Sequence, residues 1–331
     1  MKQNKNHEGK DMNSKIYKGG NPENWEKLSC CVCSSGETTR LYDSFINPDE
    51  DIQTMFWGLH RTKKRKKFRA EIQKCTGCGH IYSSPYLKEN ILKYCYSSSP
   101  FDNSWQVADN FPLSTVRRYL NEAMPFLPDR ECAMDVGCDV GFLLEVACEA
   151  GFKNVVGIEP NETAADRARV RLKSRPNVVI LNESYSEQAV SPESASFISF
   201  VHVLDHLKQP NALLKAVYKD LKPGGVVIAV THNIKSILAR LTGRRFPPIN
   251  LQHPQFFSPK SLRLLFVKTG FESLKICPTL NDYPLSHYIR YMPFMPESVK
   301  DRLVPLLNRN GAPFGLSLPL GNMMIVARKP L

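Results

Sequence analysis

Short apolar runs alternate with stretches of helical periodicity from residue 132 to residue 230. The apolar runs, which predict strands, read CAMDV, VVGIE, VVIL, FISFVHV and VVIAV, and the helical stretches between them read LLEVACEA, TAADRARVRLKS and NALLKAVYKDL. Strands that alternate with helices in this way imply right-handed βαβ units and a parallel sheet. The pattern therefore predicts an α/β fold.

Further elements are predicted on both sides of this region. The stretch STVRRYLNEAMPFL predicts a helix with Ser114 as its N-cap. On the C-terminal side, a helix is expected to begin at Ser258 and to end before Gly270, followed by strands at 271–277 and 322–328.

The same pattern gives the predicted domain organisation. Residues 1–27 are polar and show no periodicity, which predicts a flexible tail. A cysteine-bracketed stretch at 28–90 is expected to form a small module, and residues 110–331 the main domain. Within that domain, residues 281–321 are rich in proline and aromatic residues and too long for a plain hairpin, so we expect a lid or a substrate-binding insert there.

Composition narrows the class of protein. Apolar residues make up 42% of the chain and charged residues 23%, which is ordinary for a folded globular protein. No apolar stretch follows the first positive charges, and no run approaches the ~20 apolar residues of a membrane span. We therefore expect a cytoplasmic protein without a membrane span, in which the 10 cysteines are reduced thiols. The oligomeric state stays open.

The net charge of +12 is unevenly distributed. Seven of the excess positive charges lie in HRTKKRKKFR, at Arg61, Lys63, Lys64, Arg65, Lys66, Lys67 and Arg69. A run this dense attracts phosphates or an anionic membrane surface, and its simplest alternative is a solvated loop. The charge alone therefore does not decide the function.

Candidate chemistry first appears in MDVGCDVG, between the first predicted strand and its helix. A dinucleotide fingerprint needs glycine at positions 137, 139 and 142, whereas this chain has Gly137, Asp139 and Phe142. Asp139 would repel a pyrophosphate, but S-adenosylmethionine has no phosphates and carries positive charge, so carboxylates are tolerated beside it. Glu159 follows Gly137 by 22 positions, where Rossmann-type folds hold a ribose. The alternative to a ligand-binding loop at MDVGCDVG is a tight turn with a purely structural role.

MDVGCDVG, VVGIEPNETAADRAR, SFVHVLDHLKQPNALLKAVYKDLKPGG and QHPQFFSPKSLRLLFVKTGF together resemble successive motifs of class I S-adenosylmethionine-dependent methyltransferases. The resemblance covers roughly residues 115–280 and 322–328. It implies a Rossmann-like, mostly parallel seven-stranded sheet whose last strand is antiparallel. The implied cofactor-binding residues are Asp135, Gly137 and Gly141 around the methionine part, Glu159 on the ribose, and Asn182 and Glu183 beside the adenine. We also predict that Asp139 binds the cofactor. Asp139 departs from the glycine usual at its position.

Cysteine spacing gives a second signal. Cys30 and Cys33 form one C-x2-C pair and Cys75 and Cys78 another, and four thiolates in two such pairs suit a closed, tetrahedral zinc site. We therefore predict a structural zinc ion in a zinc-ribbon-like module. The 41 residues between the pairs are more than a compact ribbon needs, and Cys31 competes with Cys30 as a ligand. The alternative is four unconnected buried thiols.

Methyl transfer to an O, N or C acceptor requires removal of a proton, so a base is expected near the cofactor. HVLDHLKQP places His202, Asp205 and His206 after the fourth strand, at the carboxyl edge where open α/β sheets bind ligands. We predict His206 as the base, with Asp205 orienting or replacing it, and His202 in the cofactor wall. His232 and His253 are further candidates. For each histidine the alternative is a structural role.

We therefore expect a methyltransferase that acts on a small molecule. Methyltransferases with a similar cysteine module resemble enzymes of sugar and surface-polysaccharide pathways, which suggests such a precursor as acceptor. One alternative is an RNA methyltransferase that grips phosphates with the module and the basic run, although Phe68 is the only aromatic residue in that run. The other is a non-catalytic cofactor-binding scaffold, which only Asp139 favours.

Overall fold

The computed structural model describes residues 17–57, 68–97, 110–185, 190–292, 295–307, 315–319 and 321–331. Its contacts divide the chain into two units. The first unit comprises Met1–Phe101, His202–Leu214 and His232–Thr269, and the second comprises Asp102–Val201, Lys215–Thr231 and Gly270–Leu331. Each unit is therefore built from segments that are distant in sequence.

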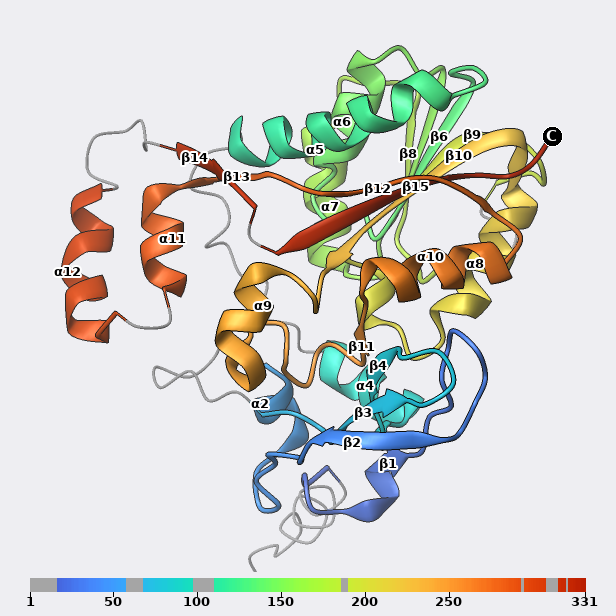
Figure 1. The fold of residues 1–331 in the computed structure, drawn as a ribbon. Helices are drawn as coiled ribbons and strands as arrows, with labels where there is room; N and C mark the ends of the chain where they lie inside the picture. The colour runs from blue at the N-terminus through green and yellow to red at the C-terminus, as the bar shows by residue number, and fades with distance from the viewer. Residues whose placement is uncertain are drawn as a thin grey trace, which may run out of the picture. The chain divides into compact units, whose positions relative to one another are not determined.

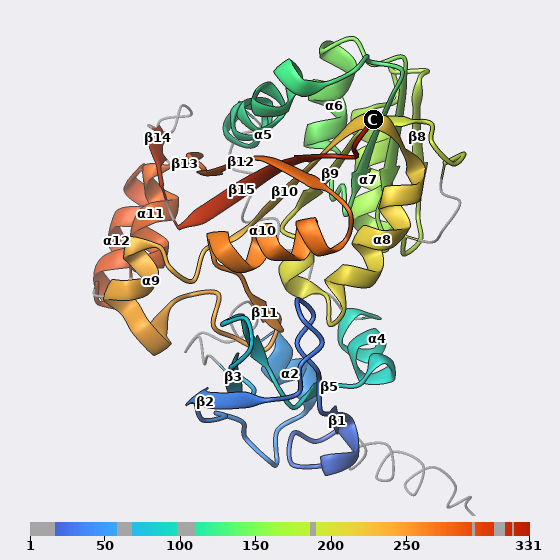
Figure 2. The ribbon, with the colours of Figure 1, turned by 45° about the vertical axis from the view of Figure 1, so that its right-hand side comes forward.

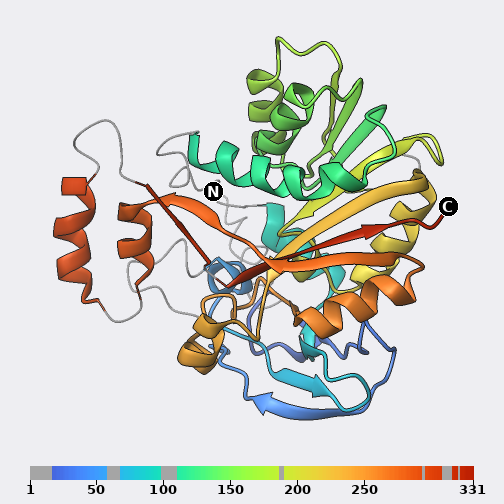
Figure 3. The same ribbon diagram turned by 45° about the horizontal axis from the view of Figure 1, so that its top comes forward.

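The second unit is organised around one large sheet (Figures 1 and 3). Among the described residues its seven strands follow the order β12-β15-β10-β9-β6-β7-β8. The pairs β10–β9, β9–β6, β6–β7 and β7–β8 are parallel, and β12 is antiparallel to β15. The bounds are β6 (Cys132–Val136), β7 (Asn154–Ile158), β8 (Val178–Leu181), β9 (Ala195–Val201), β10 (Leu221–His232), β12 (Glu272–Pro278) and β15 (Asn322–Arg328). The predicted Rossmann-like sheet is confirmed.

The interior strands of the sheet are buried because they are almost continuously apolar. All five residues of β6 are buried, and the interior strands share one core with α5 and α6. Beside the sheet lie α5 (Asn110–Ala123), η3 (Met124–Phe126), α6 (Phe142–Glu149) and α7 (Glu162–Arg171), and α8 (Pro210–Asp220) leads into β10. The Asn161 side chain caps α7 by accepting a hydrogen bond from the Ala164 amide at 3.0 Å. The helices expected between the strands are thus present.

The predicted start of α5 is wrong. The helix begins at Asn110, so Ser114 lies inside it and not at its N-cap. Pro112 does not prevent the earlier start, because proline is tolerated in the first helical turn, where backbone N–H groups have no partner within the helix. The Ser114 hydroxyl donates instead to the carbonyl oxygen of Phe111, at 3.0 Å, and to the carboxylate of Asp282.

The described parts of the segment after β12, residues 281–292, 295–307 and 315–318, contain two helices and two strands (Figure 2). Strands β13 (Asn281–Pro284) and β14 (Gly315–Leu318) pair in antiparallel fashion, and α11 (Leu285–Tyr291) and α12 (Glu297–Leu307) lie between them in sequence. The Tyr288 hydroxyl donates to the carbonyl oxygens of Asn281 and Leu316, at 2.9 and 2.8 Å. A role as lid or substrate insert stays a prediction.

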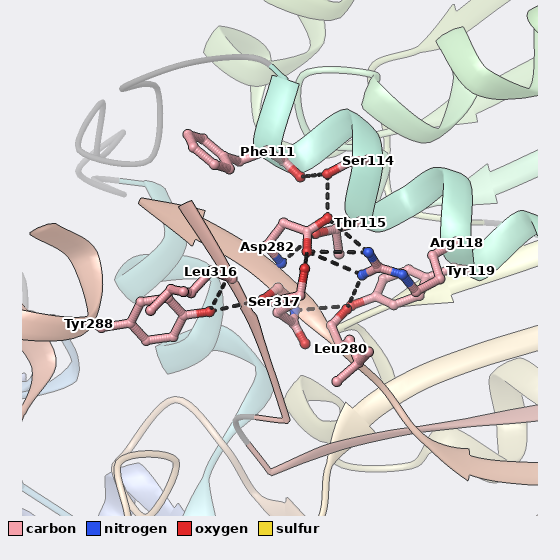
Figure 4. A network of polar contacts seen from close by, with 11 residues as sticks. Phe111, Ser114, Thr115, Arg118, Tyr119, Leu280, Asp282, Tyr288, Leu316 and Ser317 are labelled. Carbon is pink, nitrogen blue, oxygen red and sulfur yellow. Dashed lines mark hydrogen bonds and ion pairs between the residues drawn. The ribbon is translucent and has the colours of Figure 1, made fainter. Parts of the chain in front are cut away.

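Asp282 ties this insert to α5 (Figure 4). Its carboxylate accepts from both terminal nitrogens of Arg118, at 3.1 to 3.3 Å, and from the hydroxyls of Ser114 and Ser317. Its backbone N–H donates to Thr115 Oγ1 at 2.9 Å. Burial alone would raise the pKa of Asp282, but these donors lower it below its ordinary value. The base of the insert is therefore fixed by a charged, fully bonded carboxylate.

The first unit contains the cysteine-bracketed segment (Figure 2). One sheet has the order β11-β4-β3-β2 and another pairs β1 with β5. The strand bounds are β1 (Trp25–Glu26), β2 (Thr38–Tyr42), β3 (Ile72–Cys75), β4 (Ile81–Ser83), β5 (Tyr86–Leu87) and β11 (Gln255–Phe256). The helices are η1 (Pro22–Asn24), α2 (Ile52–Phe56), α4 (Glu89–Ser97), η4 (Leu204–His206), α9 (Ile237–Thr242), η5 (Gly243–Arg245) and α10 (Pro259–Lys268).

Strand β11 was not anticipated from the sequence. It comes from the stretch QHPQFF and pairs in antiparallel fashion with β4, opposing Gln255 to Tyr82 and Phe256 to Ile81. Phe256 also packs in a small apolar core with Ile72, Ile81 and Phe246. A segment from the later part of the chain thus completes the sheet of the cysteine-bracketed module.

Candidate functional site

The loop between β6 and α6 has left-handed backbone at alternate positions. The φ angles are 75° at Gly137, 48° at Asp139 and 85° at Gly141. A Cβ at Gly141 would also lie 3.0 Å from Leu172 Cδ1 and 3.3 Å from Ala168 Cβ, so a larger residue there would be both strained and crowded. The glycines let this loop pass close to a ligand.

Asp139 keeps the conformation that glycine would adopt at this position. Aspartate is one of the few non-glycine residues that enter the left-handed region at modest cost. The Asp139 amide then donates to Glu159 Oε2 at 3.0 Å. The departure from glycine therefore leaves the loop geometry intact.

Glu159 follows β7 and is largely buried, with 9% of its surface exposed. Its other carboxylate oxygen, Oε1, accepts from the Asn161 amide at 2.8 Å. Burial raises the pKa of Glu159, and the two backbone donors partly oppose that rise. Since each carboxylate oxygen has two lone pairs, both can still accept a hydroxyl. Glu159 is thus a positioned acceptor beside the loop.

The other predicted cofactor residues lie at neighbouring strand ends. Asn182 follows β8, and its side-chain amide donates to the Glu159 carbonyl oxygen at 2.9 Å. Glu183 is the next residue and is exposed. His202 directly follows β9 and belongs to the first unit. The structure thus joins Asp139, Glu159 and Asn182 through direct hydrogen bonds, while the cofactor roles of Glu183 and His202 stay predictions.

Asp135 lies inside β6 and is 3% exposed. Its Oδ1 accepts from the Ser199 hydroxyl, on the neighbouring strand β9, at 2.6 Å. Burial raises the pKa of Asp135 from 3.8 to about 7, and the Ser199 hydrogen bond offsets only part of that shift.

This shift predicts a pH-dependent stability for the protein free of cofactor. The folded state keeps the Asp135 proton up to about pH 7, whereas the unfolded carboxyl releases it near 3.8, so the folded state binds more protons in between. The free energy of unfolding should therefore fall as the pH rises through this window, by roughly 2–4 kcal/mol at about 1.4 kcal/mol per pKa unit. Urea unfolding of the wild type and of Asp135→Asn at several pH values measures this free energy. Equal pH profiles for the two proteins would contradict the prediction.

A group of histidines surrounds one carboxylate in the first unit. His202 directly follows β9, and His232 is the last residue of its parallel neighbour β10. The ring centroids of His202 and His232 are 4.7 Å apart, and those of His206 and His253 are 4.3 Å apart. Asp205 forms part of both sets, since its carboxylate lies within 4.8 Å of ligand nitrogens from each pair. The candidates expected at the carboxyl edge are thus brought together.

The electrostatics of this group follow from burial. Burial lowers the pKa of His202 to about 3 and also lowers the pKa of His206 and His253. Burial alone would raise the pKa of Asp205, but the surrounding histidines lower it below its ordinary value. At neutral pH His202, His206 and His253 are therefore neutral, and Asp205 is ionised.

Four cysteine sulfurs converge at the other candidate site. The Sγ atoms of Cys30, Cys33, Cys75 and Cys78 all lie within 4.8 Å of one another. Cys30 is 3.5 Å from Cys78 and Cys33 is 3.4 Å from Cys75, near the ~3.8 Å edge of a tetrahedron with zinc–sulfur bonds of about 2.3 Å. This geometry fits the predicted ligand set.

The two cysteine turns have matching backbones. Ser34 follows Cys33 with a φ of 63°, and Gly79 follows Cys78 with a φ of 77°. The Ser34 amide donates to the Cys30 carbonyl and the Gly79 amide to the Cys75 carbonyl, at 2.8 and 2.9 Å. Each pair therefore closes its turn in the same way.

Cys31 points elsewhere. Its Sγ lies 3.5 Å from His80 Nε2 and 3.4 Å from Gln255 Oε1, and His80 Nε2 is itself 2.8 Å from Gln255 Oε1. Cys30, and not Cys31, therefore belongs to the cluster of four sulfurs. The contacts of His80 and Gln255 were missed in the sequence, because nothing in the spacing indicates that β11 lies beside β4.

Most of the basic run, residues 60–67, lies outside the described residues. Phe68 is described and is 5% exposed, in a core with Ile52 and Phe56. It is therefore not available to stack on a nucleic-acid base. Among the described helices, none combines the length and apolar character that crossing a bilayer requires.

Comparison with known proteins identifies a methyltransferase domain in this chain. Residues 110–276, about half of the chain, match a family model described as a methyltransferase domain. Over 154 residues the chain is 30% identical to the ubiquinone biosynthesis O-methyltransferase of Idiomarina loihiensis. The matched region covers 43% of this chain and 62% of that enzyme. Over 166 residues it is 27% identical to the enzyme of the same name from Aliivibrio fischeri, covering 46% and 70%. The chain thus spans less than two thirds of the length of the Idiomarina relative.

Among solved structures, the chain is similar to an S-adenosylmethionine-dependent methyltransferase from Archaeoglobus fulgidus. The TM-score is 0.46 at 19% identity, over 69% of this chain and 98% of that one.

Proposed function

The chain belongs to the methyltransferase-domain family, and on that premise we propose that it transfers the methyl group of S-adenosylmethionine to a hydroxyl oxygen of a small-molecule acceptor. One observation carries the cofactor assignment: the Glu159 carboxylate is held by the Asp139 and Asn161 amides beside a left-handed glycine loop. The names of the O-methyltransferase relatives support oxygen as the acceptor atom.

The residues present fit the cofactor. Glu159 would accept hydrogen bonds from the ribose hydroxyls, and Asn182 and Glu183 would flank the adenine. The loop from Gly137 to Gly141 leaves room for the methionine part, and the Asp135 carboxyl lies in the strand that leads into it. The cofactor would supply an electrophilic methyl group.

His206 would accept the proton of the acceptor hydroxyl, and the negative charge of Asp205 would stabilise the imidazolium that results. Two features support this assignment. His206 is only partly buried, so a substrate can reach it, and it shares η4 with Asp205. Removal of a proton from a neutral hydroxyl is the step that an oxygen acceptor requires of the protein.

The finer acceptor class that we propose is a sugar or surface-polysaccharide precursor, since such molecules carry many hydroxyls. We further propose that Cys30, Cys33, Cys75 and Cys78 bind one structural zinc ion, because four thiolates fill a tetrahedral shell and leave no position open for chemistry.

Neither alternative function is favoured. An RNA methyltransferase gains nothing from the buried Phe68, the one aromatic residue of the basic run. The non-catalytic scaffold depended on Asp139, which keeps the left-handed backbone that a glycine would have.

The cofactor assignment predicts that Glu159→Gln weakens S-adenosylmethionine binding about tenfold or more. The variant replaces a charged acceptor by a neutral one, and hydrogen bonds to charged groups contribute roughly 1.5–3 kcal/mol. Titration calorimetry measures the dissociation constant. Glu162→Gln, an exposed residue in the first turn of α7, is the matched control and should bind normally. Equal affinities for the two variants would remove Glu159 from the cofactor site.

A further inference from the structure

We propose that His202, Asp205 and His232 bind a divalent first-row transition-metal ion, at a site distinct from the four cysteines. The three residues come from two neighbouring strand ends and the 3-10 turn η4. Two imidazoles and one carboxylate are a known metal-binding combination that leaves coordination positions open for an outside ligand. The site is inferred from the residues themselves and does not depend on the proposed reaction.

The strongest observation is the environment of Asp205. Its side chain is 1% exposed, and among the described residues neither carboxylate oxygen has a hydrogen-bond donor. Burying a carboxyl group without a hydrogen-bond partner is costly, so buried carboxylates in proteins are paired or coordinate a metal. Asp282 shows the contrast within this chain, because both of its carboxylate oxygens accept hydrogen bonds from neighbouring side chains. A cation beside Asp205 would supply the missing partner.

The donor atoms are spaced as ligands of one ion. His232 Nε2 lies 3.8 Å from Asp205 Oδ2, which is too far for a hydrogen bond. Ligand atoms from all three residues lie within 4.8 Å of one another. Two ligands that share an ion at about 2.0–2.2 Å lie up to ~4.3 Å apart, so small side-chain movements bring the set onto a common centre.

The backbone of His202 gives an independent indication. Its φ is 56°, in the left-handed region that histidine enters only occasionally. Non-glycine residues in this region cost free energy and cluster at functional sites. Here the strained residue directly follows β9 and places its ring 4.7 Å from that of His232. A metal site that needs the His202 imidazole at this position would explain the strained backbone of His202.

His206 and His253 offer a second possible set around Asp205, and two features disfavour it. His253 is 7% exposed, and its Nδ1 lies 3.1 Å from Asn250 Oδ1, so the ring is enclosed and already engaged. The His232 side chain, in contrast, is 26% exposed, which leaves room for an outside oxygen ligand. The set with His202 and His232 is therefore the open one.

The ligand types indicate the class of ion. Imidazole ligands favour zinc, iron, cobalt or nickel over magnesium and calcium, which prefer oxygen alone. If the proposed function also holds, the cation would bind the acceptor oxygen and favour its ionised form.

Titration with Co²⁺ tests the site directly. Protein whose cysteines already hold zinc is used, because cobalt bound by nitrogen and oxygen lacks the sulfur-to-metal absorption of a thiolate site. We expect one equivalent of Co²⁺ without that absorption, and affinity at least about 100-fold weaker in His202→Ala, His232→Ala and the nearly isosteric Asp205→Asn. His206→Ala, His253→Ala and the control His287→Ala, on α11 in the second unit, should bind within about threefold of wild type.

Several outcomes would overturn the site. These are no cobalt binding beyond the cysteines, unchanged binding in the three ligand variants, or loss of binding in His206→Ala and His253→Ala. Thermal unfolding and zinc content identify any variant that fails to fold, and Asp205→Asn keeps the test valid if a histidine variant does so. Because binding is measured without an acceptor, failure of the proposed methyl transfer would leave the result interpretable.

Discussion

Replacing His206 by alanine is expected to lower kcat for methyl transfer by roughly 100-fold or more, the range typical for loss of a general base. The variant removes the proton acceptor but none of the groups assigned to the cofactor, so the dissociation constant for S-adenosylmethionine should stay within about threefold. Added imidazole should restore part of the lost rate, because a small base can enter the vacated space. Single-turnover kinetics with saturating cofactor measure the effect.

The control for this prediction is Lys268→Ala, an exposed residue at the end of α10 in the first unit, which should keep normal turnover. A purely structural His206 would behave differently, since its loss would lower stability and added imidazole would not restore the rate. An unchanged kcat in His206→Ala would end its assignment as the base.

Changing both Cys75 and Cys78 to serine should release one zinc ion per chain and loosen the sheet of the first unit. Structural zinc sites contribute roughly 10 kcal/mol or more to the free energy of folding. This loss is larger than the stability that a small module gains from its apolar core. Because β4 pairs with β11, faster amide exchange should extend from β3 and β4 to Gln255 and Phe256. The strands β6 and β7 of the second unit should keep their protection.

Elemental analysis and hydrogen exchange test this together. Cys148→Ser on α6 is the matched control, since that thiol lies outside the cysteine cluster and its loss should leave the zinc content unchanged. Purified wild-type protein without stoichiometric zinc would end the idea of a structural ion. If zinc is lost but amide exchange in β11 stays unchanged, the ion does not stabilise this sheet.

The sequence predicts the large sheet well, because its signal is local. Strands such as β6 are largely apolar, and Ser258, where the sequence predicts a helix to begin, lies directly before the first residue of α10. The glycine loop and Glu159 were found for the same reason, since a fixed spacing along the chain reflects the βαβ unit itself.

Contacts between distant segments were not predictable in the same way. Asp282 is one acidic residue in a proline-rich stretch, and nothing near it indicates that Arg118 and Ser114 will be its partners 164 and 168 positions away. The left-handed backbone at His202 is likewise invisible in the sequence, as is the absence of described donors around Asp205. These features depend on tertiary packing and not on local preference.

The pairing of β11 with β4 means that this protein cannot be divided by a single cut. A fragment ending near residue 97 would lack one strand of its own sheet, and the remainder would expose Phe256 and Phe257, which are 3% and 0% exposed in the whole chain. An uncovered strand edge beside large apolar side chains favours aggregation. The cysteine-bracketed module is thus not an independent unit of the sequence. Fusing it to another enzyme would require the Gln255–Phe256 segment as well.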